Sequence, residues 1–276
     1  MTTQINCIYC KGLKPQTTTI GEHIIPEAIG SPIVTKQVCD ECNTDANKFM
    51  DSKYSNTHLM QALVRVTGTQ TKSGHLAARE QGTAFDKDIK IVFDNGEVYF
   101  TNLTEKKLNR LEDRFREEDF RALDLSVKNE NVLKREHAKI ILGLCSVCLP
   151  DFANTQTADF LREYIWGTDK TLSSKFKGGK QPQYNFLIYT RGKDFQVNHL
   201  DFSEIMNSHN FHGFRVETLG DGSYRIYLHI YSVFDAYLIP LEKNMPWNDV
   251  KIMINPANQT ITKCEGVAEQ VLLPQK

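Results

Sequence analysis

The sequence predicts an α+β protein, because its helical and β-rich segments come in separate groups instead of alternating. Two β-rich runs, 89–93 and 98–100, flank Asp94-Asn95-Gly96, a strong signal for a hairpin turn. Helical patterns follow up to residue 166, and β-rich runs return from residue 185 onward. We therefore expect the second half of the chain to contain an antiparallel sheet.

The first 66 residues are expected to form a unit of their own, which ends in a helical pattern. Apolar residues recur there at helical spacing: Phe49, Met50, Ala62, Leu63 and Val66. Residues 67–85 are polar and rich in Gly and Thr, so we interpret them as a linker or long surface loop. Residues 86–276 would then form an α+β accessory domain that has a regulatory or target-recognition role.

Start and stop signals locate the elements of this second part. We expect helices from about Thr104 to Arg121, from about Lys134 to Leu149 before Pro150, and from about Thr157 to Trp166 before Gly167. Strands are predicted wherever β-branched and aromatic residues cluster between turn signals. These strands cover residues 185–190, 211–218, 224–231, 233–238 and 250–254.

Composition narrows the functional classes. At 276 residues, 40% hydrophobic and 24% charged, the chain has the make-up of a globular protein of about two domains. No apolar run reaches the roughly 20 residues that span a bilayer, and the first ten residues do not resemble a signal peptide. We expect a cytoplasmic protein without membrane contact. The formal net charge of −1 argues against a general nucleic-acid coat protein.

Two Cys-x-x-Cys pairs predict a metal site. Cys7 and Cys10 form the first pair, and Cys39 and Cys42 the second, with 28 residues between the pairs. Four thiolates at this spacing suit a tetrahedral Zn²⁺, which would be structural because no position is left for water. The alternative is a set of unligated core cysteines.

A second group of polar residues lies between and after the cysteine pairs. Glu22-His23 precedes Ile24-Ile25-Pro26, and Asn43, Asn47 and Asp51 follow at intervals of four residues. On a helix, this interval places the three side chains on one face. A β-segment that presents Glu22 and His23 to this face would form an oxygen-rich cup suited to Mg²⁺.

These motifs together resemble the HNH endonucleases, whose core is the ββα-metal fold. The closest subtype has two zinc knuckles and an acidic-His-Ile-x-Pro first motif, here Glu-His-Ile-Ile-Pro. The resemblance covers roughly residues 5–55, about a fifth of the chain. It implies a zinc-stapled ββα-metal module at the N-terminus, ahead of the α+β domain.

The resemblance also implies roles for individual residues. His23 would be the general base that activates water, and Asn43 would orient the loop that carries this base. Glu22, where the family more often has Asp, would bind a catalytic divalent metal. Asp51 best matches the third motif position, as a second metal ligand, and Asn47 is the alternative. Asp at that position adds a negative charge, which should tighten metal binding and repel phosphate.

The expected function is a metal-dependent endonuclease that hydrolyses phosphodiester bonds of DNA with Mg²⁺ or Mn²⁺. Proteins that resemble this one often serve in bacterial restriction or anti-phage defence, so an antiviral role is expected too. The C-terminal domain would choose the target, bind an activating partner or ligand, or mediate a homodimer that makes double-strand cuts. The alternative is a non-catalytic zinc-binding module that interacts with nucleic acid or protein. A further alternative is a nuclease that stays silent until the C-terminal domain senses a ligand.

Overall fold

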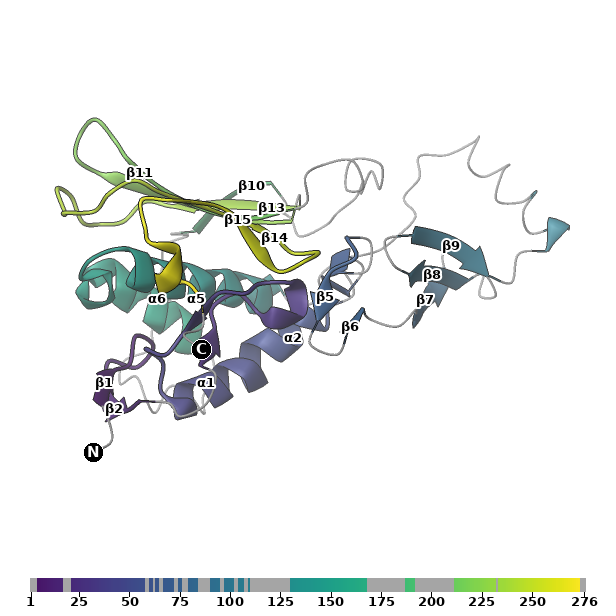
Figure 1. The fold of residues 1–276 in the computed structure, drawn as a ribbon, viewed down its shortest axis with the longest axis horizontal. Helices are drawn as coiled ribbons and strands as arrows, with labels where there is room; N and C mark the ends of the chain where they lie inside the picture. Colours follow the sequence, from purple (N-terminus) through teal and green to yellow (C-terminus); the bar gives the residue numbers. More distant parts are fainter. Residues whose placement is uncertain are drawn as a thin grey trace.

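A computed structural model of the chain has mixed helix and strand content, with antiparallel sheets (Figure 1). The structure describes residues 4–16, 21–57, 60–61, 63–64, 67–71, 74–75, 79–83, 90–94, 97–101, 104–106, 109, 130–167, 187–191, 211–231 and 233–273. None of the helices in these ranges is long and apolar enough to cross a membrane.

The largest element is a six-stranded antiparallel sheet in the order β10-β13-β12-β11-β14-β15. Its strands are β10 (Leu187–Arg191), β11 (His212–Thr218), β12 (Tyr224–Ile230), β13 (Phe234–Leu238), β14 (Val250–Asn255) and β15 (Thr260–Glu265). Side chains alternate between buried and half-buried along β12 and β14, so one face of the sheet packs on the core. The first five strands confirm the sequence prediction. The sixth, β15, was not predicted, because it is a mostly polar edge strand.

Two helices lie against the buried face of this sheet, and Figure 1 shows them between the sheet and the N-terminal elements. They are α5 (Glu130–Cys148) and α6 (Gln156–Trp166), close to the bounds predicted from the sequence. A short 3₁₀ turn, η3 (Phe152–Asn154), joins them. The Thr155 hydroxyl caps α6 by accepting a hydrogen bond from the Ala158 N–H, 3.1 Å away.

The N-terminal part contains two small strand pairs followed by a helix. The elements are β1 (Gln4–Asn6), β2 (Leu13–Pro15), β3 (Glu22–His23), η1 (Glu27–Ile29), β4 (Val34–Thr35), α1 (Asp40–Ala46), η2 (Asn47–Asp51) and α2 (Ser52–Ser55). β1 pairs with β2, and β3 pairs with β4, both antiparallel. The last three elements form one continuous helix, in which η2 is a π-helical turn.

Among the described residues between these parts, the structure has five short strands: β5 (Gln70–Thr71), β6 (Gly74–His75), β7 (Arg79–Thr83), β8 (Lys90–Asp94) and β9 (Glu97–Thr101). The β8-β9 pairing agrees with the predicted hairpin. Three of these strands, β5 to β7, fall in the range 67–85. The sequence predicts a linker or long surface loop there, because the polar residues of this range carry no hydrophobic periodicity. The predicted helix 104–121 lies almost entirely outside the described residues. The domain boundaries stay predictions.

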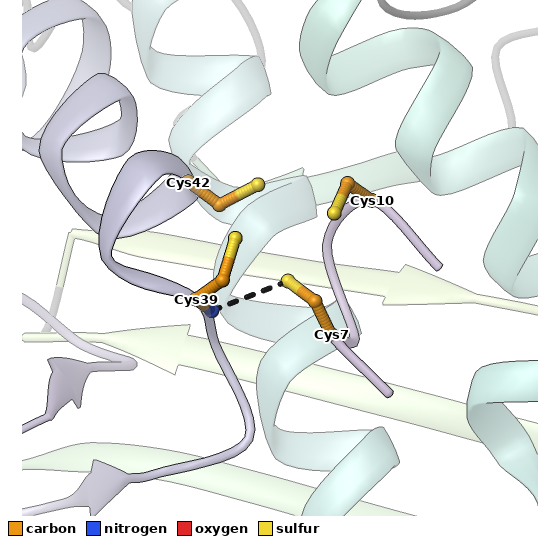
Figure 2. A group of neighbouring side chains, drawn as sticks. All are labelled: Cys7, Cys10, Cys39 and Cys42. Carbon is orange, nitrogen blue, oxygen red and sulfur yellow. Dashed lines mark hydrogen bonds between the residues drawn. The ribbon is translucent and has the colours of Figure 1, made fainter. Parts of the chain in front are cut away.

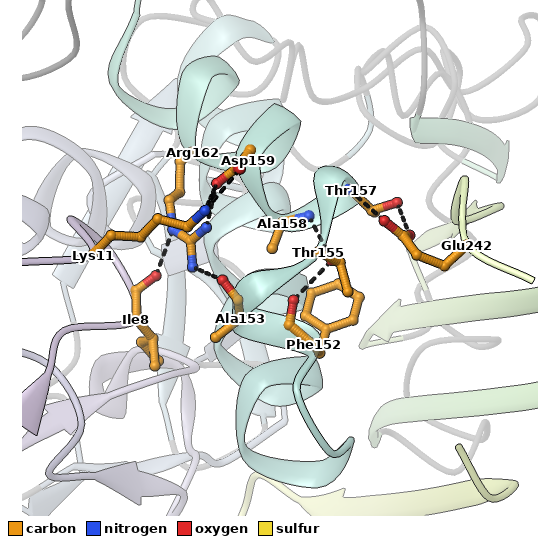
Figure 3. A network of polar contacts seen from close by, with 10 residues as sticks. All are labelled: Ile8, Lys11, Phe152, Ala153, Thr155, Thr157, Ala158, Asp159, Arg162 and Glu242. Carbon is orange, nitrogen blue, oxygen red and sulfur yellow. Dashed lines mark hydrogen bonds and ion pairs between the residues drawn. The ribbon is translucent and has the colours of Figure 1, made fainter. Parts of the chain in front are cut away.

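Arg162 of α6 joins the first cysteine loop to the helical layer (Figure 3). Its side chain is 2% exposed, and Nε donates to the Ile8 carbonyl oxygen at 2.8 Å. The other guanidinium nitrogens donate to Ala153 O at 2.6 Å and to Asp159 Oδ1 at 2.7 Å. Lys11 donates to the other oxygen of Asp159 at 2.7 Å. One buried arginine therefore connects the first cysteine loop to the helical layer.

His212 of β11 makes a second connection, between the sheet and the N-terminal part. Its Nε2 lies 2.7 Å from the Ile29 carbonyl oxygen, and its Nδ1 accepts from the Tyr231 N–H at 3.3 Å. Because a carbonyl only accepts, Nε2 carries the proton and the ring is neutral. Burial lowers the pKa of His212 to about 4, which agrees with this neutral state.

Candidate active site

The four cysteines of the two knuckles come together, as Figure 2 shows. Cys7 and Cys10 lie in the tight turn between β1 and β2, where the Cys7 N–H donates to Gly12 O at 3.0 Å. Cys39 is the residue that precedes α1, and Cys42 lies in its first turn. The second knuckle is therefore the start of the helix that also carries Asn43.

The sulfur geometry fits a metal ion. All four sulfur atoms lie within 4.8 Å of one another. In a tetrahedron with Zn–S bonds of about 2.3 Å, neighbouring sulfurs are roughly 3.8 Å apart, so a small adjustment would close the site. The pKa of Cys7 is lowered to about 5, first because Cys42 donates a hydrogen bond to it, whereas burial raises the pKa of Cys39 to about 11. A divalent cation would remove this conflict by stabilising all four thiolates.

The strand pair β3-β4 positions Glu22 and His23. Glu22 is opposite Thr35 and His23 is opposite Val34, so the two side chains leave the strand in different directions. Glu22 is 1% exposed and points into the protein, where it accepts a hydrogen bond from the Tyr9 hydroxyl at 3.2 Å. The His23 side chain stays 22% exposed, with its Nε2 3.7 Å from Glu27 Oε2.

The helix supplies the other candidates from its first three turns. The Asn43 side-chain amide donates to the Gly21 carbonyl oxygen at 3.3 Å, directly before β3. Asn47 accepts a hydrogen bond from Ser52 Oγ at 2.8 Å, within the helix itself. Asp51, at the end of the π-helical turn, points toward the interior and is 14% exposed. Of the two candidates for the third motif position, Asp51 is the one that the structure brings to Glu22.

The group that brings them together is Lys139, from α5. Its side chain is 0% exposed, and its Nζ lies 2.9 Å from Glu22 Oε1 and 2.7 Å from Asp51 Oδ1. A third carboxylate, Glu136 on the same helix, lies 3.2 Å from Nζ. The backbone oxygen of His23 lies 3.5 Å away. We call Lys139 and its three carboxylates the Lys139 cluster.

Burial and mutual repulsion set the protonation of the cluster. The pKa of Glu22 is raised to about 7, mainly by burial and also by the negative charge of Asp51. Burial raises the pKa of Glu136 well above its usual range, and Asp51 adds to the shift. For Lys139, burial acts to lower the pKa, but the three carboxylates outweigh it and raise the pKa well above the ordinary value. Lys139 is therefore an ammonium ion.

A divalent metal between Glu22 and Asp51 does not fit this arrangement. Mg²⁺ would need carboxylate oxygens at about 2.0–2.1 Å. The point that Glu22 and Asp51 share is the Lys139 nitrogen, at hydrogen-bonding distances from both. The predicted ligands thus converge, but they converge on an ammonium group of the protein itself.

Sequence reasoning missed four residues of this site: Tyr9, Glu27, Glu136 and Lys139. The helix prediction for 134–149 placed charged residues next to an apolar run, and Glu136 and Lys139 are three positions apart on one face. Such a pair in an otherwise apolar helix was the available signal. Nothing local indicated that it would face residues 22 and 51.

The structure is that of an α+β protein whose N-terminal part gathers four cysteines that could bind a metal such as zinc. Residues 7–59, about a fifth of the chain, match the family model described as HNH endonuclease. This match supports a nuclease domain and nucleic-acid binding in general. Searches of the curated proteins and of the solved structures found no match to the chain.

Proposed function

We propose that the N-terminal part is an HNH-type nuclease that hydrolyses phosphodiester bonds in DNA, with His23 as general base. The observation that carries the proposal is the setting of His23. It lies in the segment matched by the nuclease family, and its side chain is 22% exposed although both ring nitrogens are buried. Its Nε2 lies 3.7 Å from the Glu27 carboxylate. A general base must be held in one orientation, within reach of the proton that it accepts.

Each neighbour of His23 has a role in the proposal. Glu27 orients the imidazole and stabilises the positive charge that forms when His23 takes a proton from water. Asn43 fixes the chain just before β3 through its hydrogen bond to Gly21 O. The order β3, β4, α1 supports a ββα arrangement for this part. Zinc at the four cysteines would be closed to water and would hold the two loops in place.

The position of Lys139 argues against a catalytic metal at Glu22 and Asp51. The sequence predicts Mg²⁺ or Mn²⁺ at Glu22 and Asp51, and the ammonium group occupies that point. We therefore assign no step of the reaction to a metal held by these carboxylates. DNA as substrate, a defence role, a homodimer and an activating partner follow from the resemblance, whereas the cytoplasmic location follows from the composition of the sequence. All of them remain proposals.

The Lys139 cluster also favours the alternative function. With Glu22 buried and its charge already paired, the N-terminal part could serve as a non-catalytic zinc module that binds nucleic acid or protein. The two functions differ in one measurable property, which is hydrolysis that depends on His23.

A plasmid-nicking assay with the full-length, zinc-loaded protein tests the proposal. Supercoiled DNA is incubated with Mg²⁺, with Mn²⁺ or with neither, and chelators are avoided because they would remove zinc. We expect His23→Ala to slow nicking by about 10²-fold or more, the usual contribution of a general base. The matched control is His229→Ala, a histidine beside Asp235 in the C-terminal sheet, which should keep the wild-type rate.

Two results would contradict the proposal. Equal nicking by wild type and His23→Ala would remove His23 from its role. Absence of cleavage on DNA and RNA substrates under all three ion conditions would contradict it as well, and would leave the non-catalytic module and the nuclease that stays silent until its C-terminal domain senses a ligand.

A further inference from the structure

Lys139 lies where two separate parts of the N-terminal module, β3 and the π-helical turn, face α5. Glu22 comes from β3, Asp51 from the π-helical turn, and the third contact is the His23 backbone oxygen. Glu136 completes the set from α5 itself. Lys139, Glu136 and Glu22 are all at most 1% exposed.

The distances are those of an ammonium group paired with three acidic side chains, whose oxygens lie 2.7, 2.9 and 3.2 Å from Nζ. Its hydrogen bonds go to Glu22 Oε1 at 2.9 Å and to the His23 backbone oxygen at 3.5 Å, and the contacts with Asp51 and Glu136 are ion pairs. Long basic side chains normally extend their charged ends into water. The Lys139 side chain is instead fully buried, with its nitrogen among acidic groups.

The backbone is shaped to bring this lysine in. Gly143 follows Lys139 by one turn of α5 and packs on Ile24, the residue after His23. A Cβ atom at position 143 would lie 2.6 Å from Ile24 Cγ2, which is too close for real atoms. The absence of a side chain at Gly143 thus lets α5 approach β3 closely enough for Lys139 to reach Glu22.

We propose that the Lys139 ammonium is the resident cation of the Glu22–Asp51 pair, and that the wild-type protein binds no Mg²⁺ or Mn²⁺ there. The lysine supplies positive charge at the point where the sequence predicts a divalent ion. It also joins β3 to the π-helical turn through its contacts with Glu22 and Asp51. This assignment goes beyond the proposed nuclease function and does not depend on it.

Mn²⁺ binding, measured by electron paramagnetic resonance and calorimetry on full-length zinc-loaded protein, tests the inference. Wild type should have no Mn²⁺ site that depends on Asp51, so the Asp51→Asn variant should bind the same amount of Mn²⁺ as wild type. Lys139→Ala removes the ammonium and leaves space between the carboxylates, so it should gain one Mn²⁺ site that binds at least tenfold more tightly than any non-specific Mn²⁺ binding to wild type. The double variant Lys139→Ala/Asp51→Asn should lose it. Lys139→Met, which removes the charge but fills the space, is the matched control and should not gain the site.

One Mn²⁺ bound by wild type and lost in Asp51→Asn would overturn the inference, and this result needs no lysine variant to fold. A folded Lys139→Ala protein that gains no Mn²⁺ site would overturn it as well. Cleavage plays no part in either readout. A protein that binds Mn²⁺ through Asp51 and nicks DNA through His23 would therefore refute the resident cation and leave the nuclease proposal intact.

Discussion

The N-terminal part contains two clusters of acidic side chains, and they differ in the source of the positive charge that can balance them. The four cysteines gather thiols that could bind a metal ion from outside the chain. The Lys139 cluster gathers acidic side chains around a cation that the chain supplies itself. A metal at the first cluster would link folding to metal supply, whereas the second cluster links folding to a residue far away in the sequence. Spacing in the sequence reveals only the first kind of cluster.

The two clusters are alike in their dependence on the helical layer. Arg162 of α6 reaches the backbone of the first cysteine loop, and Lys139 of α5 reaches β3 and the π-helical turn. Each is a buried basic residue that has a partner in the N-terminal part and another in the helical layer. The difference between the clusters therefore concerns charge, while the support from α5 and α6 is common to both.

Removal of one knuckle cysteine should have the largest effect. Cys39→Ser should lose stoichiometric zinc and cooperative unfolding of the N-terminal part, because structural zinc contributes on the order of 10 kcal/mol in small zinc domains. Elemental analysis and thermal unfolding followed by circular dichroism measure the two properties. The control is Cys264→Ser, a half-buried cysteine of β15 outside the cluster. Retention of one zinc and of full stability in Cys39→Ser would show that the cysteines are core residues.

Loss of the internal cation should have the next largest effect. Lys139→Met leaves buried carboxylates without their counter-charge and should lower the free energy of unfolding by about 3–5 kcal/mol. Lys243→Met removes a lysine from an exposed ion pair with Asp221 and should change it by less than about 1 kcal/mol. Urea unfolding compares the two. Zinc content should stay at wild-type level in both, and equal destabilisation would contradict the central place of Lys139.

A smaller, pH-dependent effect should come from His212, which joins the sheet to the N-terminal part without any charge. Its folded pKa of about 4 lies below the ordinary 6.5, so the unfolded chain binds the proton first as the pH falls. Its contribution is complete above pH 6.5 and declines by about 1.4 kcal/mol per pH unit between pH 6.5 and 4. His212→Asn cannot titrate and should show a shallower decline in urea unfolding from pH 7 to 5. An unchanged slope would mean that this histidine is protonated in the folded state.

Much of the fold could be predicted, because it depends on local patterns. α5, α6 and five strands of the large sheet carry clear periodicity and end at Gly, Pro or turn residues. β15 and β5 to β7 could not be predicted in this way, since their residues are polar and their pairing partners supply the order. The meeting of the four cysteines was likewise predictable from spacing alone.

Only part of the candidate site could be predicted from the sequence. Glu22, His23, Asn43 and Asp51 were named from motifs, and their catalytic and metal-binding roles stay predictions. The Lys139–Glu22 contact joins residues separated by 117 positions, and nothing near either residue specifies it. It arises only when α5 packs on the N-terminal part, which is a property of the tertiary fold. A motif can thus identify ligands without identifying the cation that they bind.

The close packing of Gly143 on Ile24 has a consequence for protein engineering. A fragment that ends at residue 59, where the family match ends, would lose α5 and, with it, the positive charge between Glu22 and Asp51. To transfer this fragment into another protein, one would have to include α5 or to place a new basic residue of the recipient at the same point. In this chain the family match ends before the segment that supplies the balancing charge.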